Sequence, residues 1–179
     1  MTAGAPLGTA DEIRRRFDAL FAAPPAARGA EVASFVALRI DADRYLLRIQ
    51  AMRGLAAART IVPLPGAAAA LLGLAGIRGV VVPVFSLSAL MGYGAEPPRW
   101  LVLCESESGD PIALAFAEFD GYLEAPVTDV SPVDQREAHG VFVRELVRGR
   151  GESRGVIGLS SVVKAVCESV PAAGPMRER

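Results

Sequence analysis

A long apolar stretch with a single charge constrains this chain more than any other feature. Between Pro65 and Gly94 the only charged side chain is Arg78. The stretch is long enough to cross a bilayer, since a spanning helix needs about 20 apolar residues. An arginine near the centre of such a helix costs about 2.5 to 3.5 kcal/mol, and Pro83 and six glycines would interrupt it. We therefore predict two elements joined at residues 77–79 and no membrane span.

Size and charge limit the possible classes of protein. A chain of 179 residues fits one domain of ordinary size or two small ones. Its composition is 51% hydrophobic and 22% charged, which is typical of a folded protein. The formal net charge of -1 argues against nucleic-acid binding as the main role. The N-terminus lacks the basic start and apolar core of a signal peptide, so we expect a cytoplasmic protein.

The spacing of apolar residues predicts many short strands and few helices. Residues 50–58 fit either a short strand or a helical turn, and Pro83 places its strand at a sheet edge or beside a bulge. Gly73 is expected to end one helix, and Ser160 or Ser161 to cap the last one. This pattern is typical of small β-barrels or sandwiches. The strands are predicted over 32–40, 45–49, 80–85, 100–104, 111–123, 141–147 and 156–159, and the helices over 10–22, 67–72, 86–91 and 162–167.

Three regions are expected along the chain. Residues 1–30 form a flexible extension with a short amphipathic helix over 10–22 and a proline-rich linker. Residues 31–168 form the folded domain, and residues 169–179 a flexible tail. The N-terminal helix can dock on its own domain or bind a partner, and the sequence leaves both open.

The side chains that carry chemistry are sparse. The only histidine, His139, lies in a predicted loop with no visible partner for general base catalysis. Cys104 and Cys167 lie far apart in apolar surroundings, and each is interpreted as a buried free thiol. No metal-binding or phosphate-binding motif occurs, and the glycine-rich segment 149–152 is expected to be a hairpin loop. We therefore expect no enzyme, no catalytic residue, no metal and no cofactor.

Three consecutive motifs carry a resemblance to a known family. The hairpin 35–49 is followed by the segment IVPLPG at 61–66 and by the pattern G-x-x-x-x-R-G-x-x-x-P-V at 73–84. Over about residues 34–166, this order resembles the CheW family, the adaptor domain of bacterial chemosensory arrays. The residues that fit the third motif are Gly73, Arg78, Gly79, Pro83 and Val84.

The resemblance implies a fold, a function and a set of partners. It implies a mainly β fold of two linked five-stranded β-barrels with a few short helices. It implies a non-catalytic scaffold in chemotaxis signal transduction that couples chemoreceptors, the methyl-accepting chemotaxis proteins, to a CheA-type histidine kinase. The receptor tip would lie in an apolar groove between the barrels, and the protein would be cytoplasmic and recruited to membrane-associated receptor arrays. It would neither bind nucleic acid nor insert into the membrane.

The residues and the resemblance together select a partner-binding set around Arg78. A guanidinium beside Gly79 can reach a carboxylate of a partner, or it can tie its own loop through backbone carbonyls. Both interpretations are open, and they are compatible. The candidate residues for binding receptor or kinase are Met52, Arg53, Gly54, Gly73, Arg78, Gly79, Pro83 and Val84.

Four acids of the family pattern are neutral in this chain. The motif V-x-E appears as Met52-Arg53-Gly54, P-V-x-D-L ends with Ser86 in place of the acid, V-D-x-V has Ala117, and the final L-D has Ser160. Ser86 and Ser160 are expected to replace an acid as helix caps. These changes indicate a divergent adaptor that serves a particular receptor or kinase.

Two other functions remain as alternatives. A degenerate CheW-like domain that binds one partner would act as an inhibitor or titrator. A small-ligand-binding or enzymatic β-barrel belongs to a different class, and a hit in a metabolite screen would favour it.

Overall fold

The computed structural model describes residues 31–65, 69–94, 96–133, 142–149 and 152–169. The helix predicted over 10–22 and His139 lie outside these residues, as does most of the predicted tail. Both sheets described below belong to the compact unit that begins at Val32.

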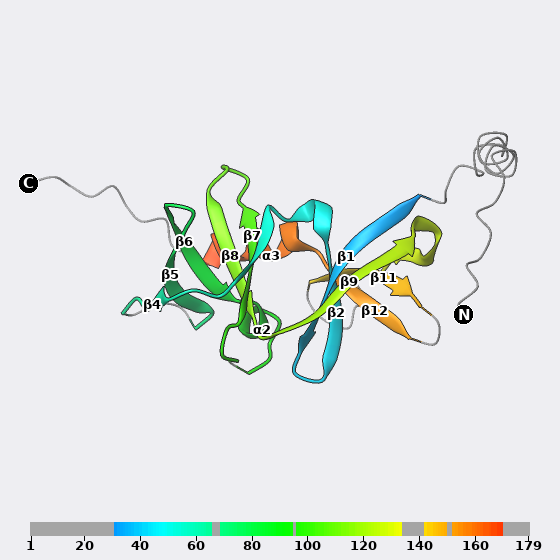
Figure 1. The fold of residues 1–179 in the computed structure, drawn as a ribbon, viewed down its shortest axis with the longest axis horizontal. Coiled ribbons are helices and arrows are strands. Elements are labelled where there is room, and N and C mark those ends of the chain that lie inside the picture. Colours follow the sequence, from blue (N-terminus) through cyan, green and yellow to red (C-terminus); the bar gives the residue numbers. More distant parts are fainter. Residues whose placement is uncertain (1–30, 66–68, 95, 134–141, 150–151, 170–179) are drawn as a thin grey trace, which may run out of the picture. The chain divides into compact units, whose positions relative to one another are not determined.

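Two antiparallel-rich sheets of six strands each form the structure (Figure 1). We call them sheet A and sheet B. Sheet A has the order β10 (Val130–Pro132), β11 (Val143–Arg148), β12 (Ser153–Ile157), β2 (Asp43–Arg48), β1 (Val32–Ile40), β9 (Glu118–Pro126). Sheet B has the order β3 (Gly54–Ala57), β7 (Trp100–Glu105), β8 (Pro111–Phe116), β6 (Val80–Ser86), β5 (Leu71–Ile77), β4 (Ile61–Val62).

The mainly β fold is confirmed, with six strands in each sheet where the resemblance implied five. Within the described residues, no pairing joins the first and last strands of either sheet. The chain starts in sheet A, builds all of sheet B from β3 to β8, and then returns to sheet A. Only Ala117 separates β8 from β9, so the strand predicted over 111–123 is two strands in different sheets.

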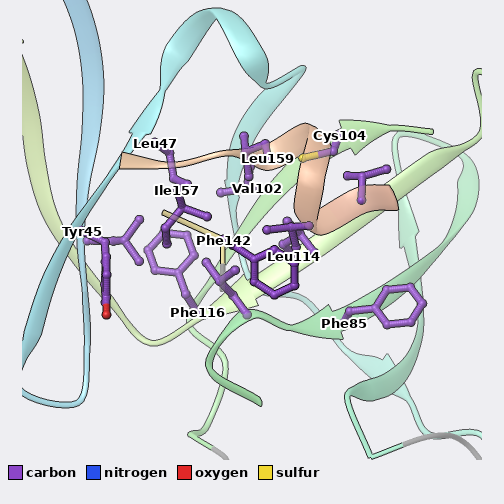
Figure 2. Close-up of a cluster of buried hydrophobic side chains, with 14 of the residues drawn as sticks. Tyr45, Leu47, Phe85, Val102, Cys104, Leu114, Phe116, Phe142, Ile157 and Leu159 are labelled. Atoms are coloured by element: carbon purple, nitrogen blue, oxygen red, sulfur yellow. The ribbon is translucent and has the colours of Figure 1, made fainter. Parts of the chain in front are cut away.

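A shared hydrophobic cluster holds the two sheets together. Strand alternation sends Val36 and Leu38 of β1 into this central cluster and Phe35 into a second cluster inside sheet A. Sheet B divides in the same way, with Leu114 in the central cluster and Ala113 in a third cluster inside the sheet. Figure 2 shows that the central cluster combines side chains of both sheets with those of the C-terminal helix.

The C-terminal helix α3 (Leu159–Ser169) completes this core. Its buried side chains recur at helical spacing on one face, and they are Leu159, Val162, Val163 and Val166. The predicted serine caps are wrong, because the helix begins at Leu159 and includes both serines. The Ser161 hydroxyl instead accepts a hydrogen bond from Arg144 Nε at 3.0 Å.

The short helices differ from the sequence predictions in one place. The cap on α2 (Leu87–Leu90) is confirmed, because Ser86 Oγ accepts a hydrogen bond from the Ala89 amide at 3.2 Å. The helix predicted over 67–72 is wrong in the part described, where residues 69–70 form a turn and β5 begins at Leu71. An alanine run favours helix only weakly, and pairing with β6 overrides it. Residues 50–58 contain both of the elements weighed, the 3-10 turn η1 (Ile49–Ala51) and β3.

The remaining connections on the sheet A side are short. The 3-10 turn η2 (Val127–Asp129) joins β9 to β10.

Within the described residues, no helix is long and apolar enough to cross a membrane. The apolar stretch around Arg78 is instead two paired strands, and the predicted junction of two elements at residues 77–79 is confirmed.

The two cysteines have different environments. Cys104 is buried as predicted, and burial raises the pKa of its thiol to about 12. The prediction of a buried Cys167 is wrong, because it is exposed on α3. It lies four residues after the buried Val163, at the edge of the apolar face of that helix.

A polar contact fastens a loop of sheet B to the first hairpin of sheet A. Tyr93, which follows α2, donates a hydrogen bond from its hydroxyl to Asp43 Oδ2. The Tyr45 hydroxyl lies 2.6 Å from the Tyr93 hydroxyl, and the two rings meet edge to face with centroids 6.4 Å apart. The Asp41 amide also donates to Glu96 Oε1 at 3.1 Å. Desolvation is the main cause that raises the pKa of Tyr93, and its hydrogen bonds with Asp43 and Tyr45 raise it further.

Replacing Tyr93 with Phe should lower the free energy of unfolding by about 1 to 2 kcal/mol, because two hydrogen bonds are lost. The raised pKa also gives a pH dependence. Unfolded tyrosine ionises near pH 10, whereas native Tyr93 keeps its proton, so stability is present below about pH 10 and lost as the pH rises further. Denaturant titrations from pH 7 upward should show a shallower alkaline loss in Tyr93→Phe than in the wild type.

Tyr122→Phe is the matched control. This tyrosine is 70% exposed, and its hydroxyl makes no hydrogen bond within the described residues. An alkaline stability loss that is unchanged in Tyr93→Phe would contradict the proposed role of the contact.

Candidate partner-binding surface

Arg78 lies at the tip of the β5–β6 hairpin. Ile77 pairs with Val80, so Arg78 and Gly79 form a two-residue turn. Their φ angles are 50° and 81°, and two successive positive values are typical of the type I′ turn that fits the twist of a hairpin. Gly79 adopts this conformation at no steric cost, whereas arginine does so rarely. The turn therefore holds the Arg78 side chain at an exposed end of sheet B.

The Arg78 side chain reaches a strand that is distant in sequence. Gly54 begins β3 at the opposite edge of sheet B, where it pairs with Leu103. A Cβ atom at Gly54 would lie 4.0 Å from Arg78 Nη2 and 3.8 Å from Leu103 Cδ1. We call Gly54, Arg78, Val80 and Val81 the Arg78 rim. The two valines are 50% and 66% exposed, and strand alternation sends their side chains to opposite faces of β6 beside the Arg78 turn.

The sequence segment that supplies the Arg78 rim carries charges of one sign. From residue 49 to residue 95 the sequence contains three arginines and no aspartate or glutamate. Arg53 forms an ion pair with Glu105. In the part of the chain that the structure describes, no acid lies within ion-pair distance of Arg78. The Arg78 rim is thus basic as well as apolar.

The other predicted residues divide between the surface and the interior. Met52 is half-buried and packs against the central cluster. Val84 is fully buried inside sheet B. Pro83 pairs with Leu74 and lies on the face of β6 opposite Val82 and Val84. β6 pairs with β8 only from Val84 onward, so the missing amide of Pro83 costs no bond to β8.

The predicted site residues therefore do not all lie together, and Gly73 lies apart from the residues at the Arg78 turn. Gly54, Arg78 and Gly79 meet at the tip of sheet B. Gly73 lies five residues from Arg78 along β5, a separation of about 16 Å at roughly 3.3 Å per residue. Its bulge faces Val84 and Phe85, which explains the predicted bulge near Pro83. Within the described ranges, no three potential metal ligands cluster.

A second exposed feature was not predicted from the sequence. Trp100, Phe119 and Tyr122 form a row with ring centroids 5.1 Å and 5.3 Å apart. Trp100 and Phe119 pack against the central cluster, while Tyr122 is 70% exposed. Tyr122 pairs with Val36 and so lies on the face of sheet A that carries this cluster. We call these three residues the aromatic row. The signal in the sequence was a tyrosine among the acids of an otherwise alternating strand, Glu118–Pro126.

The comparisons with known proteins identify the family. The family model for the CheW-like domain matches residues 34–165. The chain belongs to the CheW family. Among solved structures, it is similar to the scaffolding protein TtCheW from Thermoanaerobacter tengcongensis, with a TM-score of 0.66 and 16% sequence identity over 74% of this chain and 92% of that chain. At that identity the likeness supports the fold alone. A comparison with curated proteins found no match.

In this CheW-family chain, Gly73 has a packing role of its own. Its φ is +142°, and an added Cβ would lie 2.1 Å from the Val62 carbonyl oxygen and 2.7 Å from the Val62 carbonyl carbon. These are backbone atoms of β4, so they cannot move aside as a side chain can. Glycine is required here because two strands approach closely at a bulge.

Gly73→Ala should therefore destabilise the CheW-like domain by about 3 kcal/mol, because the methyl group collides with backbone in a strained conformation. Gly76→Ala is the matched control in the same strand, since its Cβ would meet nothing within 4 Å. We expect that variant to stay within about 0.5 kcal/mol of the wild type. Urea unfolding followed by circular dichroism measures both, and equal stabilities of the two variants would contradict the packing role.

Proposed function

We propose that this protein is a non-catalytic adaptor that couples chemoreceptors to a CheA-type histidine kinase in a chemosensory pathway. The observation that carries the proposal is the CheW-like domain match, which spans residues 34–165 and thus both sheets. The similar TtCheW is described as a scaffolding protein. In this role the chain supplies surfaces and no chemistry, in the cytoplasm at membrane-associated receptor arrays.

An adaptor needs two surfaces that can be occupied together, and two exposed features suit this need. The Arg78 rim belongs to strands of sheet B, whereas Tyr122 of the aromatic row belongs to β9 of sheet A. Exposed aromatic and apolar side chains suit an amphipathic helix, such as the receptor tip. The Arg78 rim, with its single-sign charge, suits the regulatory domain of the kinase.

The absent family acids favour one further candidate function. Gly54 and Ala117 remove a carboxylate from the family pattern without replacing its hydrogen-bonding capacity. A domain that has kept only one working surface would bind one partner and act as an inhibitor or titrator. In that case one of the two surfaces would be silent in binding.

Arg78→Ala should weaken binding to the kinase regulatory domain at least tenfold, or about 1.4 kcal/mol, while leaving binding to the receptor tip unchanged. Tyr122→Ala should do the reverse. Isothermal titration with each purified partner measures both effects. Both substitutions remove exposed side chains, so the fold should be retained.

Lys164→Ala is the control, because it removes an exposed cation of α3 that belongs to neither the Arg78 rim nor the aromatic row. If Arg78→Ala and Tyr122→Ala bind both partners as tightly as the wild type does, these two surfaces are excluded as the partner-binding sites. If the wild type binds only one of the two partners and both variants lose that binding, the result favours the inhibitor function.

A further inference from the structure

Within the described residues, Arg78 is one of five arginines that form no ion pair, and the others are Arg59, Arg99, Arg144 and Arg148. Within the described residues, the arginines that form ion pairs are Arg39, Arg44, Arg48, Arg53 and Arg154. No hydrogen bond joins Arg78 to a backbone carbonyl in the same ranges. A guanidinium presents five N–H donors in a rigid fork that matches a carboxylate. Arg78 therefore offers its full donor set to solvent or to a partner.

The space in front of this guanidinium is open because of Gly54. The nearest Arg78 nitrogen lies 4.0 Å from the position of a Gly54 Cβ, so a longer acidic side chain at residue 54 could bond to Arg78. The φ of Gly54 is outside the left-handed region, so the backbone does not require glycine there. Within the described residues, the chain has room for a carboxylate at the Arg78 rim but supplies none.

The apolar surroundings decide what can cover this surface. Val80 and Val81 directly follow the Arg78 turn, so a partner that covers the turn together with either exposed valine also removes water from Arg78. A desolvated guanidinium without an acceptor costs several kcal/mol, whereas a bidentate carboxylate pair strengthens as water leaves. The partner must therefore bring its own acid together with apolar side chains, and the acid-free segment 49–95 provides the opposite charge.

We propose that the space at Gly54 is filled in trans: Arg78 binds a carboxylate that the regulatory domain of the kinase presents beside an apolar patch. This inference rests on the proposed function and adds the chemistry of one contact. It implies that an acid at residue 54 competes with the partner for Arg78.

The test compares Gly54→Glu with Gly54→Gln, two variants of equal size that differ in charge. The introduced carboxylate should pair with Arg78, so the Kd for the purified kinase regulatory domain should be at least tenfold higher in Gly54→Glu than in Gly54→Gln. Adding Arg78→Ala should bring the two variants to the same Kd. The thermal midpoint should be higher for Gly54→Glu than for Gly54→Gln, and this difference should vanish in the Arg78→Ala background and decrease with salt.

The outcomes separate the inference from the proposed function. If the wild type binds the kinase domain and Gly54→Glu binds it as tightly as Gly54→Gln, or more tightly, the carboxylate in trans is excluded while the adaptor function stands. Equal thermal midpoints for the two variants would show that residue 54 does not reach Arg78, which also overturns the inference. Failure of the wild type to bind the kinase domain overturns the adaptor function together with the inference.

Discussion

The burial of both faces of each sheet is the constraint on which the rest of the structure depends. β1 shows it most clearly, because Phe35 and Ala37 enter the cluster inside sheet A while Val36, Leu38 and Ile40 enter the central cluster. β8 divides in the same way in sheet B. Separating the sheets would expose the central cluster to water, at roughly 25 cal/mol per Å² of apolar surface. The two sheets therefore form one folding unit with one core between them.

The shared core also determines where the two proposed partner-binding surfaces lie. The chain crosses at Ala117 from sheet B to sheet A, and the aromatic row spans this crossing, with Trp100 before it and Phe119 and Tyr122 after it. The β5–β6 hairpin contributes Ala75, Ile77, Val82 and Val84 to the third cluster and ends in the exposed Arg78 turn. A rigid core thus holds two separate surfaces in a fixed relation, which is the property that an adaptor needs.

Local patterns predicted the parts of the fold that depend on local interactions. Alternation marked the first hairpin, the glycine after Arg78 marked the β5–β6 turn, and Ser86 marked the start of α2. Pairing between distant segments explains the errors. Residues 71–72 joined a strand because β6 lies beside them, and the strand at 111–123 divided because its halves pair with different sheets. The proximity of Gly54 and Arg78 also depends on strand order, which no local pattern contains.

Simultaneous binding of two partners is the central claim, and kinase activity in a reconstituted mixture measures it directly. A receptor cytoplasmic tip and the kinase are held at fixed concentrations while this protein is added in increasing amounts. An adaptor should raise the rate of kinase autophosphorylation to a maximum near stoichiometry, because it brings receptor and kinase together, and lower it again in excess, because separate binary complexes then form. A rate that only falls, or does not change at any ratio, would contradict the adaptor function.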